Sequence, residues 1–311
     1  MKLRKIIPII GILIFVFLLF RIGIKNILSS LISGNLLFIF ISMLLVPIII
    51  FLQAFKWNVI LKKQKIGIPF PIVLKLQLIS IFYGFLTPGR IGSFVRIFYV
   101  KEHTKKKLSE SMSNVVLDKA LDFFMVFLFA LFGSLLLGNY LLDNLIYVIG
   151  IIFAAFVFCI LFFLKKERSA FVLRLVYKLL IPNRFKKDAK NSFHSFYKDM
   201  LNIKDLTLPF ILAFLTWVFI YTQMYVFARA YSIDIGYFYT IAIFSISVVV
   251  SLIPITISGL GTRELTLVAL FSIFAVSADA VMAMSIIGIF ITNVIPSIAG
   301  WYFTLKKSHQ L

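Results

Sequence analysis

Two stretches of the sequence place arginine close to glycines within long apolar runs. The first is Pro88-Gly89-Arg90-Ile91-Gly92, and Arg96 follows a few residues later. Glycine lets the backbone approach a ligand closely, helix N-termini attract anions, and a guanidinium offers two parallel donors to phosphate. We therefore expect Gly89, Arg90, Gly92 and Arg96 to contribute to an anion site. The alternative is an interfacial turn whose arginine extends into cytoplasmic water.

The second stretch is Ser258-Gly259-Leu260-Gly261-Thr262-Arg263-Glu264, which lies shortly after Pro254. Its arginine and glutamate are adjacent charges in a long apolar segment, where charges are costly and usually functional. We expect the second half of the anion site here, formed by Gly259, Gly261, Arg263 and Glu264. The alternative is an ion pair that only pins the local structure.

A third group of charges lies near the start of an apolar helix predicted over Val115–Leu137. Asp118 and Asp122 share one face of that helix, and Lys119 can reach Asp122 across one turn. Because these charges avoid lipid, the face should point into the protein. The two arginines of the first stretch are the candidate partners. Such a charge network can serve function, structural locking or both.

Residues typical of metal and nucleophile chemistry are sparse. His103, His194 and His309 lie in polar segments without ligand spacing, and the single cysteine, Cys159, lies in an apolar run. The sequence has no zinc-protease, Walker or nucleophile-elbow motif. We therefore expect no metal, no cofactor and no enzymatic reaction.

The composition indicates the solvent that surrounds these charges. Hydrophobic residues make up 61% of the chain and charged residues 14%, whereas soluble domains have about 45–50% and about 25%. The sequence therefore predicts an all-α polytopic membrane protein with one transmembrane domain over residues 1–311. The net charge of +20 comes from basic residues between apolar runs. The positive-inside rule explains this distribution without nucleic acid as a partner.

Long apolar runs near the roughly 20 residues of a membrane span predict about six spanning helices. They are Ile6–Ile24, Leu36–Phe55, Val115–Leu137, Leu145–Leu164, Leu208–Ala228 and Val281–Leu305. The first lacks a small-residue cleavage site and is expected to be retained as a helix or signal anchor. Two further apolar stretches, Ile72–Val100 and Tyr237–Phe274, are interrupted by the two arginine-glycine motifs.

The lysines around the first interrupted stretch decide how it enters the membrane. Lys62, Lys63 and Lys65 precede it, and Lys101 and Lys105 to Lys107 follow it. A re-entrant hairpin keeps both clusters in the cytoplasm, as the positive-inside rule favours. Irregular backbone at membrane depth is tolerated where it is buried or lines a wet cavity. Two re-entrant hairpins place both termini on the cytoplasmic side of the cytoplasmic membrane.

Two similar units follow from this topology. Leu36–Phe55 with the first hairpin and Leu208–Ala228 with the second run in opposite directions. They predict an inverted repeat, in which both hairpin tips approach mid-depth, as in many transporters. The basic cytoplasmic loop at residues 165–205 carries Phe193, Phe196, Tyr197, Met200 and Leu201 at helical spacing. This spacing predicts an amphipathic helix on the inner leaflet, or one packed on the membrane domain.

Three motifs together resemble a known family, the lysylphosphatidylglycerol synthase transmembrane region, also called the flippase-like or UPF0104 membrane proteins. They are TPGRIGSFVRIFYV at residues 87–100, VVLDKALDFF at residues 115–124 and IPITISGLGTREL at residues 253–265. The resemblance covers nearly the whole chain, and its third motif is the most specific. Where the family has Glu after Pro-Gly-Arg-x-Gly, this chain has Ser93. The family's Glu-Arg-x-x-Asp corresponds to Asp118-Lys119-Ala120-Leu121-Asp122.

The resemblance implies the lipid-translocating part of the family rather than lipid lysylation. We expect a phospholipid or lipid-linked headgroup to enter between the hairpins, where Arg90, Arg96 and Arg263 meet its phosphate. Membrane lipids are the expected partners, and the sequence predicts no oligomeric state. Two alternatives are a membrane-embedded lipid-modifying transferase and a scaffold for a partner enzyme of envelope lipid metabolism.

Overall fold

The computed structural model describes residues 3–104, 108–138, 140, 143–164, 193–197, 200–253 and 256–308. Every regular element of these residues is a helix. The first part of the chain contains α1 (Leu3–Ile22), α2 (Ile24–Ile32), α3 (Leu36–Lys63), α4 (Phe70–Phe85), η1 (Ile91–Val95), α5 (Arg96–Thr104), α6 (Leu108–Leu136) and α7 (Asp143–Leu164). The second part contains η3 (Ile203–Leu206), α10 (Thr207–Ala230), α11 (Tyr237–Leu252), α12 (Thr262–Ser272), α13 (Ala278–Ile289), η4 (Phe290–Val294) and α14 (Ile295–Ser308). The predicted all-α polytopic fold is confirmed.

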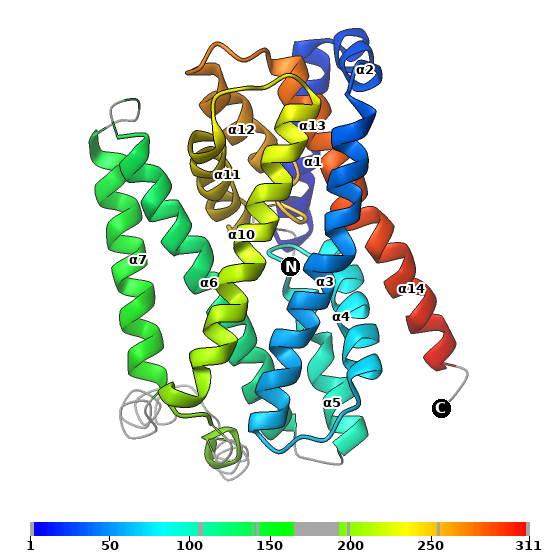
Figure 1. Ribbon diagram of the computed structural model, residues 1–311, viewed down its shortest axis with the longest axis vertical. Helices are drawn as coiled ribbons and strands as arrows, with labels where there is room; N and C mark the ends of the chain where they lie inside the picture. The colour runs from blue at the N-terminus through cyan, green and yellow to red at the C-terminus, as the bar shows by residue number, and fades with distance from the viewer. Residues whose placement is uncertain are drawn as a thin grey trace.

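All six regions predicted to span are helical, although their lengths differ from the prediction. Leu36–Lys63, Ile203–Ala230 and Ala278–Lys306 are long and apolar enough to cross a membrane, as judged on the described residues. A fourth candidate is α1 with α2, which are bent by 83°. The bend lies at Gly23, whose φ of 97° suits glycine. The first span therefore ends at Ile22, and α2 turns away from it (Figure 1). The two other long helices are α6 and α7, with 29 and 22 residues.

Both interrupted stretches fold as hairpins, which confirms this part of the prediction. In the first, α4 leads to a non-helical tip, and η1 with α5 returns along α4. The Ser80 hydroxyl donates to the Ser93 carbonyl at 3.0 Å and joins the two arms. Gly92 lies against the Tyr83 carbonyl, where a Cβ would overlap.

The second hairpin consists of α11, a tip and α12, and Gly259 packs closely on Ser251 of the other arm. Figure 1 shows the first hairpin in the lower half of the molecule and the second in the upper half. Pro254, expected to break this stretch, lies outside the described residues.

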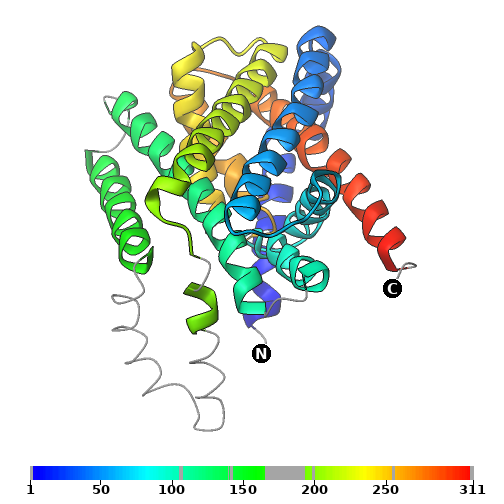
Figure 2. The same ribbon diagram turned by 60° about the horizontal axis from the view of Figure 1, so that its bottom comes forward.

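The two units pack on each other reciprocally. The paired helices α3 and α10 lie side by side at the centre, while α4 packs on α14 and α11 packs on α6 (Figure 2). Each exchange uses a glycine for close approach. A Cβ on Gly300 would overlap the Leu78 carbonyl, and one on Gly133 would lie 2.8 Å from the Ala242 Cα. This exchange of partners is the packing that an inverted repeat predicts.

The basic loop is described only in part. Residues 193–197 are helical, which agrees with the helical spacing of Phe193, Phe196 and Tyr197. Met200 and Leu201, predicted to continue this helix, lie in non-helical chain instead. Residues 165–192 and 198–199 of the loop lie outside the described residues.

Candidate functional site

The two hairpin tips meet inside the protein. Pro88 and Ile257 form an antiparallel bridge, and each precedes two residues with positive φ. In the first tip these are Gly89 at 58° and Arg90 at 56°; in the second they are Ser258 at 52° and Gly259 at 80°. Side-chain-bearing residues adopt this conformation at a cost and do so often at functional sites. The tips are therefore similar in backbone and touch at corresponding positions.

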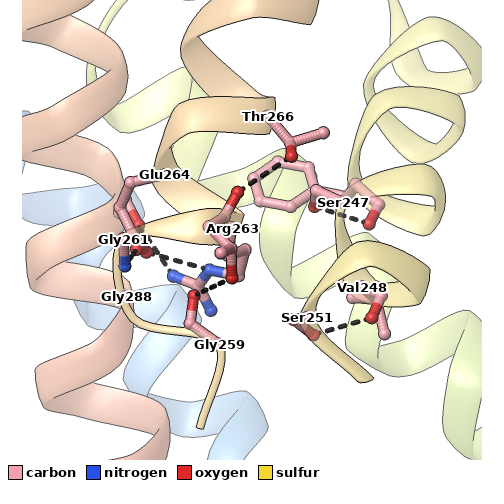
Figure 3. A network of polar contacts seen from close by, with 12 residues as sticks. Ser247, Val248, Ser251, Gly259, Gly261, Arg263, Glu264, Thr266 and Gly288 are labelled. Atoms are coloured by element: carbon pink, nitrogen blue, oxygen red, sulfur yellow. Dashed lines mark hydrogen bonds and ion pairs between the residues drawn. The ribbon is translucent and has the colours of Figure 1, made fainter. Parts of the chain in front are cut away.

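The second tip is fixed by Glu264, which is fully buried. The Gly261 amide donates to Glu264 Oε2 at 2.6 Å, which caps the start of α12 (Figure 3). Arg263 Nε donates to Glu264 Oε1 at 3.1 Å, and its Nη2 donates to the Ser285 hydroxyl at 2.7 Å. That hydroxyl donates onward to Glu264 Oε1 at 2.8 Å. Arg263 is thus held in place by its own neighbour and by α13.

The first tip leaves its arginine less constrained. Arg90 donates from Nη2 to Asn293 Oδ1 at 3.2 Å. It forms no ion pair with the described residues, and its side chain is accessible. Asn293 lies on η4, a π-helical turn between α13 and α14, and such turns are frequent at functional sites. Arg90 can therefore accept an anionic ligand without first losing a carboxylate.

The predicted charge network lies between α3, α5 and α6. Arg96 is buried and pairs with Asp118 at 2.7 Å. Lys56 is also buried; its Nζ lies 3.0 Å from Asp118 Oδ1 and 2.5 Å from Asp122 Oδ1. Lys119 lies 3.7 Å from Asp122 Oδ2. Asp122 therefore connects the buried pairs to the more accessible Lys119.

Neutral side chains extend this network. The Arg96 guanidinium lies 4.4 Å from the ring centroid of Trp57, within the range of cation–π attraction. Arg96 also donates to Gln77 Oε1 at 3.0 Å, and Gln77 donates to Gln53 Oε1 at 2.8 Å. These partners hold Arg96 in a buried position, although its Nε has no hydrogen-bond partner among the described residues.

A cavity of about 220 Å³ lies between the tips and the central helices. Its charged wall is formed by Arg90, Lys119, Asp122 and Arg263. Its apolar wall comes mainly from α10 and α11, with Trp217, Tyr221, Met224, Phe244 and Val248. A neighbouring hollow of about 90 Å³ shares Arg90, Lys119 and Asp122 with it. The arrangement offers cations on one side and hydrocarbon contact on the other.

Three buried polar atoms along this cavity have no hydrogen-bond partner among the described residues. They are the Trp217 indole nitrogen, the Tyr221 hydroxyl and the Ser258 hydroxyl. Buried polar groups are usually satisfied, and exceptions call for an explanation.

The structure divides the predicted site residues into two sets. Arg90, Arg263, Gly89, Lys119 and Asp122 line the cavity, and Glu264 lines a small hollow beside it. Arg96, expected to meet a headgroup, is instead buried in the network with Asp118, so we correct its role to a structural one.

The remaining glycines act through packing or backbone. Gly92 and Gly259 permit close contact between hairpin arms. Gly261 gives its amide to Glu264 and is not free for a ligand.

Several site residues were not predicted from the sequence, above all Lys56, Gln53 and Asn293. Lys56 was missed because the span was ended at Phe55, whereas α3 continues to Lys63. A lysine inside an apolar helix was the available signal. Gln53 and Asn293 carry no charge, and no comparable signal marks them. Within the described residues, no three His, Cys, Asp or Glu side chains are grouped as metal ligands would be.

Fold and site together define a multi-pass helical membrane protein in which the tips of two helical hairpins meet beside a cationic cavity. The family model of the lysylphosphatidylglycerol synthase TM region matches residues 8–300, and the chain belongs to this family.

Similar proteins are found over nearly the full length. A UPF0104 membrane protein of Pyrococcus horikoshii is 23% identical, covering 99% of this chain and 98% of its own. One from Methanothermobacter thermautotrophicus is 23% identical over 94% and 90%. Another, from Methanocaldococcus jannaschii, is 20% identical over 98% and 95%. The family assignment is consistent with a role connected with membrane lipids.

Proposed function

We propose that the protein translocates a phospholipid or a lipid-linked headgroup across the cytoplasmic membrane. The observation that carries this proposal is the meeting of the two tips. They come from opposite halves of the molecule (Figure 1), touch at Pro88 and Ile257, and place Arg90 and Arg263 in one cavity wall. A site at the junction of inverted units can be reached alternately from either side.

The walls of the cavity suit an amphiphile. A phosphate would lie against the guanidinium groups, which bind it through paired hydrogen bonds. The acyl chains would follow the apolar wall formed by α10 and α11, toward the lipid. Moving only the polar head through the protein avoids the high cost of bringing a charge into hydrocarbon.

The orientation proposed places the ends of α3, α5 and α14 in the cytoplasm, with both termini on that side. Lys62 and Lys63 lie in the last turn of α3 and Lys101 in the last turn of α5, as the positive-inside rule favours for a cytoplasmic side. Single cysteines at positions 63 and 101 should react with an impermeant reagent from the same side in inside-out vesicles. Labelling of the two positions from opposite sides would contradict this orientation.

The function is tested by Arg90→Lys and Arg263→Lys in proteoliposomes that contain fluorescent phospholipids. Lysine keeps the charge but loses the paired donors, so we expect translocation to fall at least about 10-fold in each variant. Arg229→Lys, at the end of α10 and away from the cavity, is the matched control and should retain full activity.

Folding of each variant is checked first by size-exclusion chromatography. Full translocation by both cavity variants would contradict a shared headgroup site. A folded wild-type protein that moves no lipid would favour the lipid-modifying or scaffold alternatives.

A further inference from the structure

The charges around the cavity do not balance. Five cations and three carboxylates occupy the network and the tips among the described residues: Lys56, Arg90, Arg96, Lys119, Arg263, Asp118, Asp122 and Glu264. At their formal charges, two positive charges remain without a carboxylate. Like charges held together in a low-dielectric region repel strongly, so an anion at this place is favoured.

The distances identify which cations are in excess. Asp118 Oδ2 forms an ion pair with Arg96 Nη2 at 2.7 Å, and Asp122 Oδ1 forms one with Lys56 Nζ at 2.5 Å. Glu264 is occupied by Arg263 at 3.1 Å. Each carboxylate thus already has a close cation.

The two cations left are Arg90 and Lys119. Arg90 forms no ion pair with the described residues, and its one side-chain hydrogen bond goes to the neutral Asn293. Lys119 lies 3.7 Å from Asp122, beyond hydrogen-bond distance, and Lys56 holds that carboxylate much more closely. Both excess cations line the larger cavity and also the smaller hollow beside it.

We propose that the ligand of this cavity carries a phosphate group with two negative charges, a phosphate monoester or a pyrophosphate. This inference rests on the proposed function and specifies its substrate class. One negative charge compensates Arg90 and the other compensates Lys119. A zwitterionic headgroup brings no net charge and leaves the imbalance in place.

The size of the cavity agrees with this class. Its volume of about 220 Å³ is below the roughly 300–1,000 Å³ of sites for drug-sized ligands. A compact phosphate fits this space better than a headgroup that carries a sugar. Arg263, which also lines the cavity, can bind a further phosphate oxygen.

The test measures binding to the full-length protein in detergent at constant ionic strength. Three probes are compared: short-chain phosphatidic acid, phosphatidylcholine with the same chains, and inorganic pyrophosphate alone. We expect phosphatidic acid to bind roughly 10- to 100-fold more tightly than phosphatidylcholine at a pH where its phosphate carries two charges. Equal affinity for the two lipids would overturn the proposal.

Substitutions that change the charge of the cavity test whether the ligand carries two negative charges. Lys119→Met removes one excess cation and should weaken phosphatidic acid binding roughly 10-fold or more. Ser93 is buried, at 6% exposure, and lines the cavity near Arg90. Ser93→Glu should therefore weaken binding by a similar factor, while Ser93→Gln, of equal size, should weaken it much less. Unchanged affinity in folded Lys119→Met would overturn the proposal even if both Ser93 variants fail to fold.

The three probes also show whether the phosphate belongs to a lipid or to a soluble anion. They distinguish failure of this inference from failure of the proposed translocation. Pyrophosphate binding as tightly as phosphatidic acid would support the dianion site and assign it to a soluble anion. Phosphatidic acid that binds tightly but is not moved in proteoliposomes would support the site and contradict translocation. Translocation of both lipids at equal rates and with equal affinity would support translocation and overturn the charge inference.

Discussion

The two hairpin tips have similar backbones but hold their arginines differently. In the second tip, Arg263 is bound by the adjacent Glu264 and by Ser285 of α13. In the first tip, Arg90 has the neutral Asn293 as its partner, and the carboxylates near it serve Lys56 and Arg96 instead. In two units of similar fold, the second therefore holds its arginine in an ion pair, whereas the first leaves its arginine available to a ligand.

The difference arises from where each unit obtains its carboxylate. In the first unit, Asp118 and Asp122 come from α6, the helix that follows the hairpin. In the second unit, the corresponding helix α13 supplies the neutral Ser285, and the carboxylate lies in the hairpin itself. We infer that the first unit discriminates between ligands while the second holds the tip geometry. The following predictions test this division.

The largest expected effect is that of Asp118→Asn. This change leaves Lys56 and Arg96 buried with one carboxylate fewer, and breaking such a buried pair costs about 3–5 kcal/mol. We expect a strong loss of folded protein, measured by thermal unfolding in detergent. Asp122→Asn should be milder than Asp118→Asn, because Asp122 is more accessible, but still more damaging than the loss of any loop lysine. A normal melting temperature for Asp118→Asn would show that the network contributes little to stability.

An intermediate effect is expected for Glu264→Gln in the second tip. Glutamine can still accept a hydrogen bond, but Arg263 loses its only close carboxylate among the described residues. Hydrogen bonds to charged groups contribute about 1.5–3 kcal/mol, and we expect a destabilisation of this size. Ser285→Ala is the companion variant and should cost less, because it removes a neutral partner. If Glu264→Gln retained full stability, the ion pair would not fix Arg263 in the second tip.

The hairpins and their meeting could be predicted from the sequence because charge decides topology in a membrane. Lysines on both sides of the first interrupted stretch predicted that its two ends lie on the same side of the membrane, and the opposite orientation of the second unit predicted that the tips carrying Arg90 and Arg263 approach each other. The sequence offered Arg90 and Arg96 as partners of the carboxylates, and the structure pairs Arg96 with Asp118. That this pairing buries Arg96 away from the cavity could not be predicted, because spacing along the chain does not show how α5 packs on α6. Lys56 was missed because the predicted span ended at Phe55, where the apolar run ends, whereas α3 continues to Lys63. The bend at Gly23 depends on one backbone angle that hydropathy does not report.

The smallest effect is expected for the pair Arg229–Asp234, which lies outside the cavity and serves as an exposed counterpart of Arg96–Asp118. The hydrogen bond from Arg229 lowers the pKa of the Asp234 carboxyl below its usual value. A lowered pKa means that any stabilisation is present above the unfolded pKa of about 3.9 and is lost as the pH falls through the folded pKa. Water screens this pair, because Asp234 is 62% exposed. Asp234→Asn should therefore leave the melting temperature at pH 7 unchanged within error, while Asp118→Asn lowers it strongly. If Asp234→Asn and Asp118→Asn lowered the melting temperature by similar amounts, burial would not distinguish the two ion pairs. The contrast between the fixed and the available arginine would then have no physical basis.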